Sequence, residues 1–300
     1  MKKLTLHILI TAALFFVFDR SLGLVLRQLY RQSNATDAYK ISYSCESTTD
    51  SILFMGSSRC LHHFVPDVFE KELNTSCYNT ADWGIKNIYF HYGMLSNILE
   101  RYTPKTIVFE IHPCDWLQTQ FSDIERAGSL APYCGMSKGC DDMLKLAGTY
   151  WPYQLSVVYR YTGNFPDLMA GRWGSMDRNL KGWKPLDGQL DTTGVVAEEY
   201  PFAPDQQKQE ILEQFISTCK EKGIRLILTV SPMYVCSKNK PFDFVQKLST
   251  KHHLPYIYHY DDPDYVGHAE YFYDFGHLNR QGALKYSEKF SKELGQILTD

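Results

Sequence analysis

The sequence predicts a single α/β domain built on a parallel β-sheet. Short, uniformly apolar runs alternate with amphipathic segments, which is typical of buried parallel strands joined by surface helices. In the first alternation, an apolar run at 52–55 ends at Gly56, and apolar residues at helical spacing follow at 66–73. The chain has 300 residues, of which 44% are hydrophobic, so it can bury a full core. One domain with an insertion fits these values better than two domains.

The remaining elements are predicted in chain order, each from its own pattern. Residues 76–79 form a short strand, 85–101 a helix with one apolar face, and 106–111 a strand after a break at Pro104. The later elements are a helix at 205–222 that ends at Gly223, a strand at 225–230, a helix at 242–252, a strand at 256–260 and a helix at 284–298. Strands joined through helices cross over right-handed, so we expect a parallel sheet.

The N-terminal residues are predicted to lie outside this sheet. Residues 1–18 join a basic start to an apolar stretch that stops at Asp19 and is shorter than the ~20 residues that span a bilayer comfortably. Residues 1–30 are a cleaved signal peptide, a retained membrane anchor or a buried amphipathic helix, and we favour export with retention at the membrane. Residues 31–50 are polar and predict a linker to the domain at 51–300.

Regular alternation fails between residues 116 and 204, which predicts a loop-rich insertion. An insertion of this length inside a compact domain is more often functional than filler. Since it lies between the third and fourth strands, it can fold over the carboxyl edge of the sheet as a cap. Trp173, Trp183 and Tyr200 then either form a surface for an acceptor substrate or pack the insertion onto the core.

The turn Gly56-Ser57-Ser58 follows the first predicted strand and precedes a helix. Open α/β sheets bind ligands at the carboxyl ends of their strands, where the next helix points its N-terminus. The two serines therefore either expose a nucleophile or cap a helix. A serine needs a base to remove its proton, and that base needs an orienting acceptor. Asp274 and His277, three residues apart before the terminal helix, can supply both.

Three segments resemble blocks of the SGNH (GDSL-type) hydrolases. Ile52-Leu-Phe-Met-Gly-Ser-Ser58 resembles the first block, with Ser57 at the usual aspartate and Ser58 at the nucleophile. Asp274-Phe-Gly-His277 resembles the closing block, which implies that these residues complete a catalytic triad. Tyr78-Asn-Thr-Ala-Asp-Trp-Gly84 has the spacing of the second block, which implies an oxyanion hole made by the N–H groups of Ser58 and Gly84. The family implies a three-layer, flavodoxin-like fold with a five-stranded parallel sheet.

The third block departs from the family, because Cys114 stands where the oxyanion asparagine is expected. A thiol is a weak donor compared with an amide, so its place in the oxyanion hole is doubtful. His112 is either a substitute donor beside the substrate or a turn residue before Pro113. Arg59 either binds a substrate carboxylate or phosphate or is a solvated residue at a helix start. The Gly-Ser-Ser start, the altered third block and the N-terminal apolar segment are more similar to the membrane-anchored branch, which includes the D-alanyl transfer protein of teichoic acid and alginate O-acetyltransferase relatives.

Composition narrows the function classes. The formal net charge is −3 and no polybasic run occurs, so nucleic acid is not an expected partner. No cysteine or histidine cluster has zinc-binding spacing, so we expect no metal and no cofactor. Cys134 and Cys140 are the local candidates for a disulfide if the domain is exported. The paired histidines lack a third ligand and are predicted at the surface: His62, His63, His252 and His253.

The sequence therefore predicts a serine esterase or O-acyltransferase, located at the membrane or exported to the periplasm or cell surface. Its expected substrates are acyl groups, acetyl above all, on a cell-surface glycan, or a small acyl ester. A membrane protein that delivers acyl groups is a possible partner. The alternative is a non-catalytic glycan-binding or assembly protein that keeps the fold, which Cys114 favours and the triad residues oppose.

Overall fold

The computed structural model describes residues 1–33, 38–84, 86–119, 127–165, 168, 178–197, 199–239 and 241–299. Within these residues, a five-stranded sheet has the order β2-β1-β3-β4-β5, and all its neighbouring strands are parallel. The strands are β1 (Ile52–Gly56), β2 (Cys77–Asn79), β3 (Thr106–Glu110), β4 (Arg225–Val230) and β5 (Tyr256–Tyr258). This is the flavodoxin-like strand order, so the predicted fold class is confirmed.

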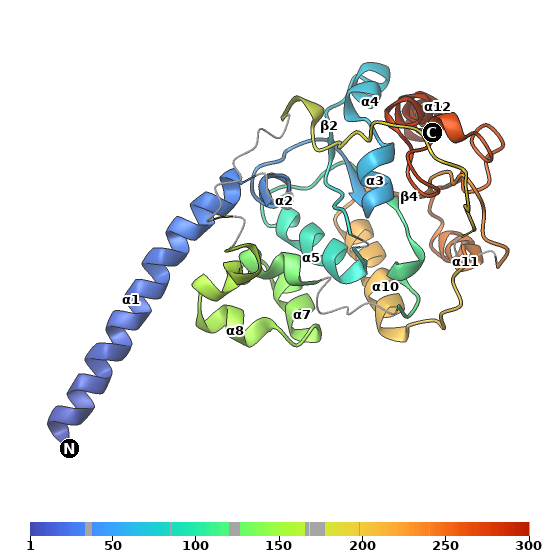
Figure 1. Cartoon of the computed structure of the whole chain (residues 1–300). Helices are drawn as coiled ribbons and strands as arrows, with labels where there is room; N and C mark the ends of the chain where they lie inside the picture. Colours follow the sequence, from blue (N-terminus) through green and yellow to red (C-terminus); the bar gives the residue numbers. More distant parts are fainter. Residues whose placement is uncertain are drawn as a thin grey trace.

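Helices cover both faces of the sheet because side chains along each strand alternate between the faces. Leu53 and Met55 pack in one core cluster, whereas Ile52 and Phe54 pack in the other. The first face is covered by α5 (Ile88–Leu99), α10 (Gln206–Glu221) and α11 (Asp243–His252). The second face is covered by α3 (Ser58–His63), α4 (Pro66–Leu73) and α12 (Arg280–Thr299). Figure 1 shows the resulting three layers.

The strand register brings three loops to one edge of the sheet. Gly56 at the end of β1 is opposite Glu110 at the end of β3, and Glu110 is opposite Thr229 of β4. The strands therefore finish nearly level at their carboxyl ends. The residues that follow them, from 57, 111 and 231, meet at this edge, which is where open α/β sheets place their sites.

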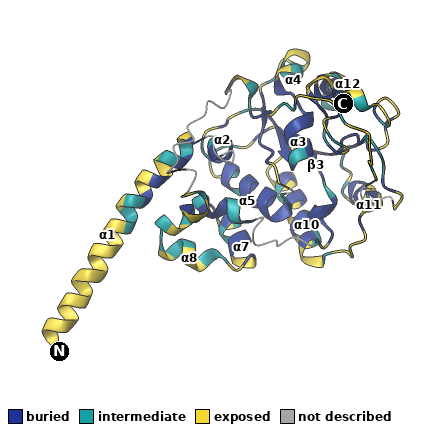
Figure 2. Ribbon diagram, viewed as in Figure 1, coloured by how far each residue is buried: buried dark blue, intermediate teal, exposed yellow. Residues whose placement is uncertain are grey.

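Two helices precede the sheet, α1 (Lys2–Gln32) and α2 (Ala38–Glu46). Figure 2 shows that the N-terminal half of α1 is exposed, while its C-terminal half contacts the domain. By length and composition, α1 can cross a membrane, which both an anchor and a signal sequence would do. The linker predicted at 31–50 is corrected over α2, because Ile41 and Cys45 are buried in the core. The polar composition predicted an exposed segment, but Ser42 Oγ has a hydrogen-bond partner inside the fold, the Tyr133 hydroxyl 2.9 Å away.

The insertion predicted at 116–204 has two parts among the described residues. The first part comprises η3 (Gly128–Tyr133), α7 (Lys138–Leu146), α8 (Tyr150–Leu155) and η4 (Val158–Asn164). It packs against α5 and α1, where α7 buries Met143 and Leu144, and Ser129 of η3 accepts a hydrogen bond from Lys86 in the loop after β2. The second part continues from η5 (Arg178–Leu180) toward the edge, where the Leu190 N–H donates to the Phe272 carbonyl at 2.8 Å. Only this second part reaches the loop that carries Asp274 and His277.

Candidate active site

Ser58 stands at the point where β1 turns into α3. Gly56 ends the strand with φ of +152°, and a Cβ there would lie 2.7 Å from the Glu110 carbonyl oxygen, so the close approach of β3 requires glycine. Ser57 precedes α3 in an extended conformation, and Ser58 is its first residue. Ser57 is buried while Ser58 is partly exposed, so only the second serine is presented to solvent. The N–H of Ser58 belongs to the first helical turn and has no intrahelical acceptor.

His277 and Asp274 lie on a short loop that faces Ser58. His277 Nε2 is 2.8 Å from Ser58 Oγ, and His277 Nδ1 is 2.9 Å from both carboxylate oxygens of Asp274. The carboxylate also accepts the N–H groups of Gly276 and His277. Because Nδ1–H donates to Asp274, the neutral imidazole has its lone pair on Nε2, facing the serine hydroxyl. The sequence prediction placed these three residues in one triad, and the fold brings them together.

The carboxylate of Asp274 is held in its ionised form. Burial opposes ionisation, but the hydrogen bonds from the His277 ring and from the loop N–H groups outweigh it and lower the pKa of Asp274. A carboxylate in this position orients the imidazole and stabilises the imidazolium that forms when the ring accepts a proton. The three side chains can therefore activate the serine hydroxyl as a nucleophile.

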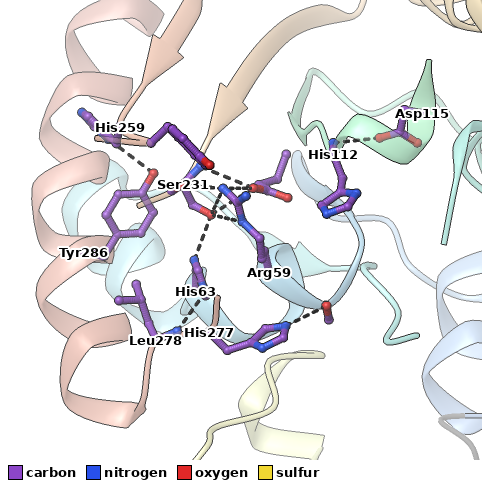
Figure 3. Close-up of polar contacts among 12 residues, drawn as sticks. Arg59, His63, His112, Asp115, Ser231, His259, His277, Leu278 and Tyr286 are labelled. Atoms are coloured by element: carbon purple, nitrogen blue, oxygen red, sulfur yellow. Dashed lines mark hydrogen bonds and ion pairs between the residues drawn. The ribbon is translucent and has the colours of Figure 1, made fainter. Parts of the chain in front are cut away.

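A buried layer of polar side chains lies directly beneath His277. His63 Nε2 accepts the N–H of Leu278 at 2.9 Å, so its hydrogen is on Nδ1, which is 2.9 Å from Ser231 Oγ. Ser231 Oγ in turn donates to Glu110 Oε1 at 2.9 Å. Figure 3 shows this chain of contacts running from Leu278 through His63 to Ser231. It connects the residue after His277 to the ends of β3 and β4.

Arg59 completes this buried layer and is not positioned to bind a substrate. Its Nη2 lies 2.9 Å from Glu110 Oε1, and it also donates to the Ser231 carbonyl (Figure 3). The side chains of Arg59 and Glu110 are 4% and 0% exposed. Burial raises the pKa of Glu110 even though Arg59 and Ser231 favour the carboxylate. The predicted role of Arg59 in substrate binding is corrected, because a buried cation is held by an internal partner.

The surface position predicted for His62 and His63 is wrong. His63 is fully buried, and burial together with the charge of Arg59 holds its pKa well below the ordinary value, so the ring is neutral. His62 is 7% exposed, and its Nδ1 donates to the Lys184 carbonyl at 2.6 Å. Its ring centroid is 5.4 Å from that of His277, and burial lowers its pKa to about 4. Sequence spacing alone did not show that the short helix α3 is enclosed by α12 and the insertion.

The loops after β2 and β3 carry the other predicted site residues. Gly84 lies in an exposed turn after β2 with φ of +83°, and its role as an oxyanion donor stays a prediction. Cys114 lies in η2 (Pro113–Asp115), where its thiol donates to the Lys86 carbonyl at 3.2 Å. His112 Nδ1 accepts the Cys114 N–H at 3.3 Å. The neutral His112 ring therefore carries its hydrogen on Nε2, where it is a donor.

Three aromatic residues of the insertion were predicted either to form an acceptor surface or to pack on the core, and two of them lie in the described part of the chain. Trp183 is 5% exposed, and its Nε1–H donates to the His62 carbonyl at 2.9 Å. Tyr200 is 8% exposed, with its ring centroid 6.0 Å from that of His112. Trp173 lies outside the described residues. Trp183 and Tyr200 are therefore better interpreted as packing residues. The ring of Tyr200 also lies beside that of His112.

The described part of the chain has neither a disulfide nor a cluster of metal-binding side chains. All eight cysteines are free thiols, so the disulfide considered between Cys134 and Cys140 is not formed. Cys140 is instead directed at the Tyr133 carbonyl, 3.7 Å away. Within the described ranges, no group of three or more His, Cys, Asp or Glu side chains is arranged to hold a metal ion.

Comparisons with known proteins add little to this geometry. No protein-family model and no curated protein sequence matches the chain. A crystal structure from Bacteroides fragilis, named a "putative acylhydrolase", aligns over 83% of this chain and 88% of its own with a TM-score of 0.40 and 11% identity. At this level of similarity, any function has to be argued from the site itself.

Proposed function

We propose that this protein is a serine-dependent acyl-ester hydrolase or O-acyltransferase with Ser58 as its nucleophile. The observation that carries the proposal is the hydrogen-bonded series Ser58 Oγ, His277 Nε2, His277 Nδ1 and Asp274, with each contact between 2.8 and 2.9 Å. With the Nδ1–H of His277 directed at Asp274, Nε2 is left as the acceptor that general-base activation of a serine requires. A serine that merely caps a helix has no need of an oriented imidazole.

In the first half-reaction, Ser58 Oγ attacks the carbonyl carbon of an ester while His277 Nε2 takes the hydroxyl proton. Asp274 stabilises the resulting imidazolium through Nδ1–H. When the tetrahedral intermediate collapses, the bond to the ester oxygen breaks and His277 gives its proton to the departing alcohol. The acyl group is then bonded to Ser58.

In the second half-reaction, the acceptor resolves the acyl-enzyme. Water gives hydrolysis, and a sugar hydroxyl gives transfer, with His277 again taking the proton of the attacking group. We propose a cell-surface glycan as substrate, with acetyl as the acyl group, on the resemblance of the Gly-Ser-Ser start, the altered third block and the N-terminal apolar segment to the membrane-anchored SGNH branch. A small acyl ester or a membrane protein would supply the acyl group for transfer.

The oxyanion that forms in both half-reactions needs hydrogen-bond donors. We propose that the N–H of Ser58, the N–H of Gly84 and the Nε2–H of His112 supply them. The thiol of Cys114 donates to the Lys86 carbonyl, which uses its single hydrogen within the loop. His112 is therefore the better candidate for the donor that an asparagine provides in the SGNH family.

We propose that α1 anchors the protein and that the domain lies outside the cytoplasm. Residues 2–18 of α1 are exposed throughout, and the helix is long and apolar enough to cross a membrane. Such a surface is not stable in water but suits a bilayer. The C-terminal half of α1 packs on the domain, which favours a retained helix over a cleaved signal peptide.

The experiment that tests the activity is turnover of p-nitrophenyl acetate by the full chain in detergent, with fluorophosphonate labelling in parallel. We expect Ser58→Ala and His277→Ala to abolish both signals, whereas the neighbouring control Ser57→Ala retains them. If the folded wild-type protein neither turns over the ester nor takes the label, the enzyme proposal is wrong and a non-catalytic glycan-binding or assembly protein becomes the better interpretation.

A further inference from the structure

An exposed apolar patch lies on the first part of the insertion. We call it the α8 patch; its large side chains are Leu146, Trp151, Leu155, Tyr159 and Phe165, with exposed fractions of 47%, 70%, 77%, 48% and 44%. Helix α8 has the sequence Tyr-Trp-Pro-Tyr-Gln-Leu, yet none of its residues is buried. Trp151 and Leu155 are four residues apart and share one face of the helix. Exposed large apolar side chains concentrated in one segment, here residues 146–165, indicate an interaction site.

The patch lies where α1 passes from its apolar half to its packed half. Asp19 is the first charged residue after the apolar run, and its carboxylate accepts the N–H groups of Val157 at 2.9 Å and Val158 at 3.2 Å. It also accepts the Ser156 hydroxyl, directly after the end of α8. One turn further along α1, a Cβ on Gly23 would lie 2.4 Å from Val157 Cγ1, so the two segments are in direct contact. The patch is therefore tied to α1 at a defined height.

The position of the α8 patch along α1 matches the surface of a bilayer that α1 crosses. The apolar run from Leu4 to Phe18 has a length of about 22 Å at the rise of an α-helix, whereas a hydrocarbon core is about 30 Å thick. A short anchor draws the residues that flank it toward the membrane. Leu24 and Val25, beyond Asp19, are still 67% and 54% exposed. Figure 1 shows α7 and α8 on the side of the domain toward which the N-terminal half of α1 extends.

We propose that the α8 patch is a membrane-contacting surface that sits in the headgroup region of the bilayer that holds α1. The patch offers tryptophan and tyrosine, the side chains that prefer this region, beside leucine and phenylalanine. This inference rests on the anchoring role proposed for α1. The domain is then docked on the membrane at two places and cannot swing freely. The active site at the carboxyl edge of the sheet is held at a constant height above the lipid.

The test measures quenching of tryptophan fluorescence by brominated lipids. The full chain is reconstituted into vesicles of equal parts phosphatidylcholine and phosphatidylglycerol, with or without bromine on the upper acyl carbons. We expect a bromine-dependent loss of emission in the wild-type protein that largely disappears in Trp151→Phe. The control is Trp116→Phe. Trp116 is 1% exposed and packs on Phe242 and Phe244 in the core, so its removal should leave the bromine-dependent loss of emission unchanged.

Leu155→Glu provides a second, independent variant. It places a charge at the proposed interface on a side chain that is 77% exposed, so the domain folds while the quenching falls to the level of Trp151→Phe. Equal quenching in wild type and Trp151→Phe overturns the proposal. So does a dimer that Leu155→Glu dissociates, because the patch is then a contact between two copies.

Flotation of the chain with the vesicles tests the α1 anchor separately from the α8 patch. If the wild-type chain does not float with the vesicles, the anchor itself is wrong and the membrane contact falls with it. If the chain floats but the patch is not quenched, the anchor stands and only the patch is wrong. Ester turnover by Ser58 is measured on the same samples and reports on the proposed activity separately.

Discussion

Two layers of polar side chains meet at His277, and they differ in exposure. The reactive layer consists of Ser58, Asp274 and His277, of which the last two have side chains 40% and 27% exposed. The supporting layer consists of Arg59, His63, Glu110 and Ser231, none of which is more than 4% exposed. In the proposed activity, the outer groups have to reach a substrate. The inner groups exclude water, which strengthens the hydrogen bonds that hold the loop of His277.

Substitutions in the two layers are therefore expected to have different effects. Loss of a reactive group removes chemistry but leaves few buried atoms without partners. Loss of a supporting group leaves a buried charge or donor unsatisfied, which lowers the free energy of unfolding. Four sets of variants distinguish a loss of activity from a loss of stability; the largest expected effect comes first.

The strongest test of the reactive layer is Asp274→Asn. The amide keeps the volume and can still accept the loop N–H groups, but its NH₂ group favours the imidazole tautomer with hydrogen on Nε2. That tautomer cannot take the proton of Ser58, so we expect kcat to fall by about 10⁴-fold with little change in stability. Ester turnover measures this. Asp187→Asn, which breaks the exposed ion pair with Arg280, is the matched control and should be neutral. A loss of less than tenfold for Asp274→Asn would contradict the assignment.

The strongest test of the supporting layer is Glu110→Gln. It leaves the guanidinium of Arg59 buried without a counter-charge, and breaking a buried pair costs about 3–5 kcal/mol of unfolding free energy. Thermal or urea unfolding in detergent measures it. Glu213→Gln is the control, because Glu213 pairs with Lys251 and His252 at the surface, where such pairs contribute about 0–1 kcal/mol. Similar unfolding midpoints for the two variants would show that the buried pair has no special role.

The loop after β3 contains His112 and Cys114, which are two residues apart and have different expected roles. If His112 Nε2–H meets the oxyanion, His112→Ala lowers kcat by about 10²–10³-fold. Cys114→Ala removes a hydrogen bond to the Lys86 carbonyl, worth about 1 kcal/mol of stability, and changes kcat by less than tenfold. Paired kinetic and unfolding measurements on both variants distinguish the roles. The reverse ranking in kcat would assign the donor to Cys114.

The smallest expected effect concerns pH and His62. Its folded pKa of about 4 lies below the unfolded value of about 6.5, so the unfolded chain binds the proton first as pH falls. Stability is therefore complete above pH 6.5 and declines toward pH 4, and at pH 5 the loss from this group is about 2 kcal/mol. His62→Asn keeps a donor for the Lys184 carbonyl but cannot titrate. Its stability should fall by about 2 kcal/mol less than wild type between pH 7 and pH 5, and equal slopes would rule the effect out.

The two layers also differ in how far they could be predicted from sequence. Ser58 follows a short apolar strand, and Asp274 and His277 are three residues apart, so a local pattern marks each of them. His63 and Ser231 carry no such mark. The burial of Glu110 could have been predicted, because it is a carboxylate inside an otherwise apolar strand and a buried charge requires a partner. Arg59, near the end of the neighbouring strand, is a cation that could have been predicted as this partner.

Local patterns were enough to predict the strands, most of the helices around them and the three residues of the reactive layer, because hydrophobic period and turn residues act over a few positions. Which polar residues are buried followed only from the packing of the whole domain. α2 became a packed helix and His63 a core residue, since burial depends on elements far away in the chain. The height of the α8 patch relative to α1 was likewise set by contacts of Asp19 with residues 156–158, more than a hundred positions away.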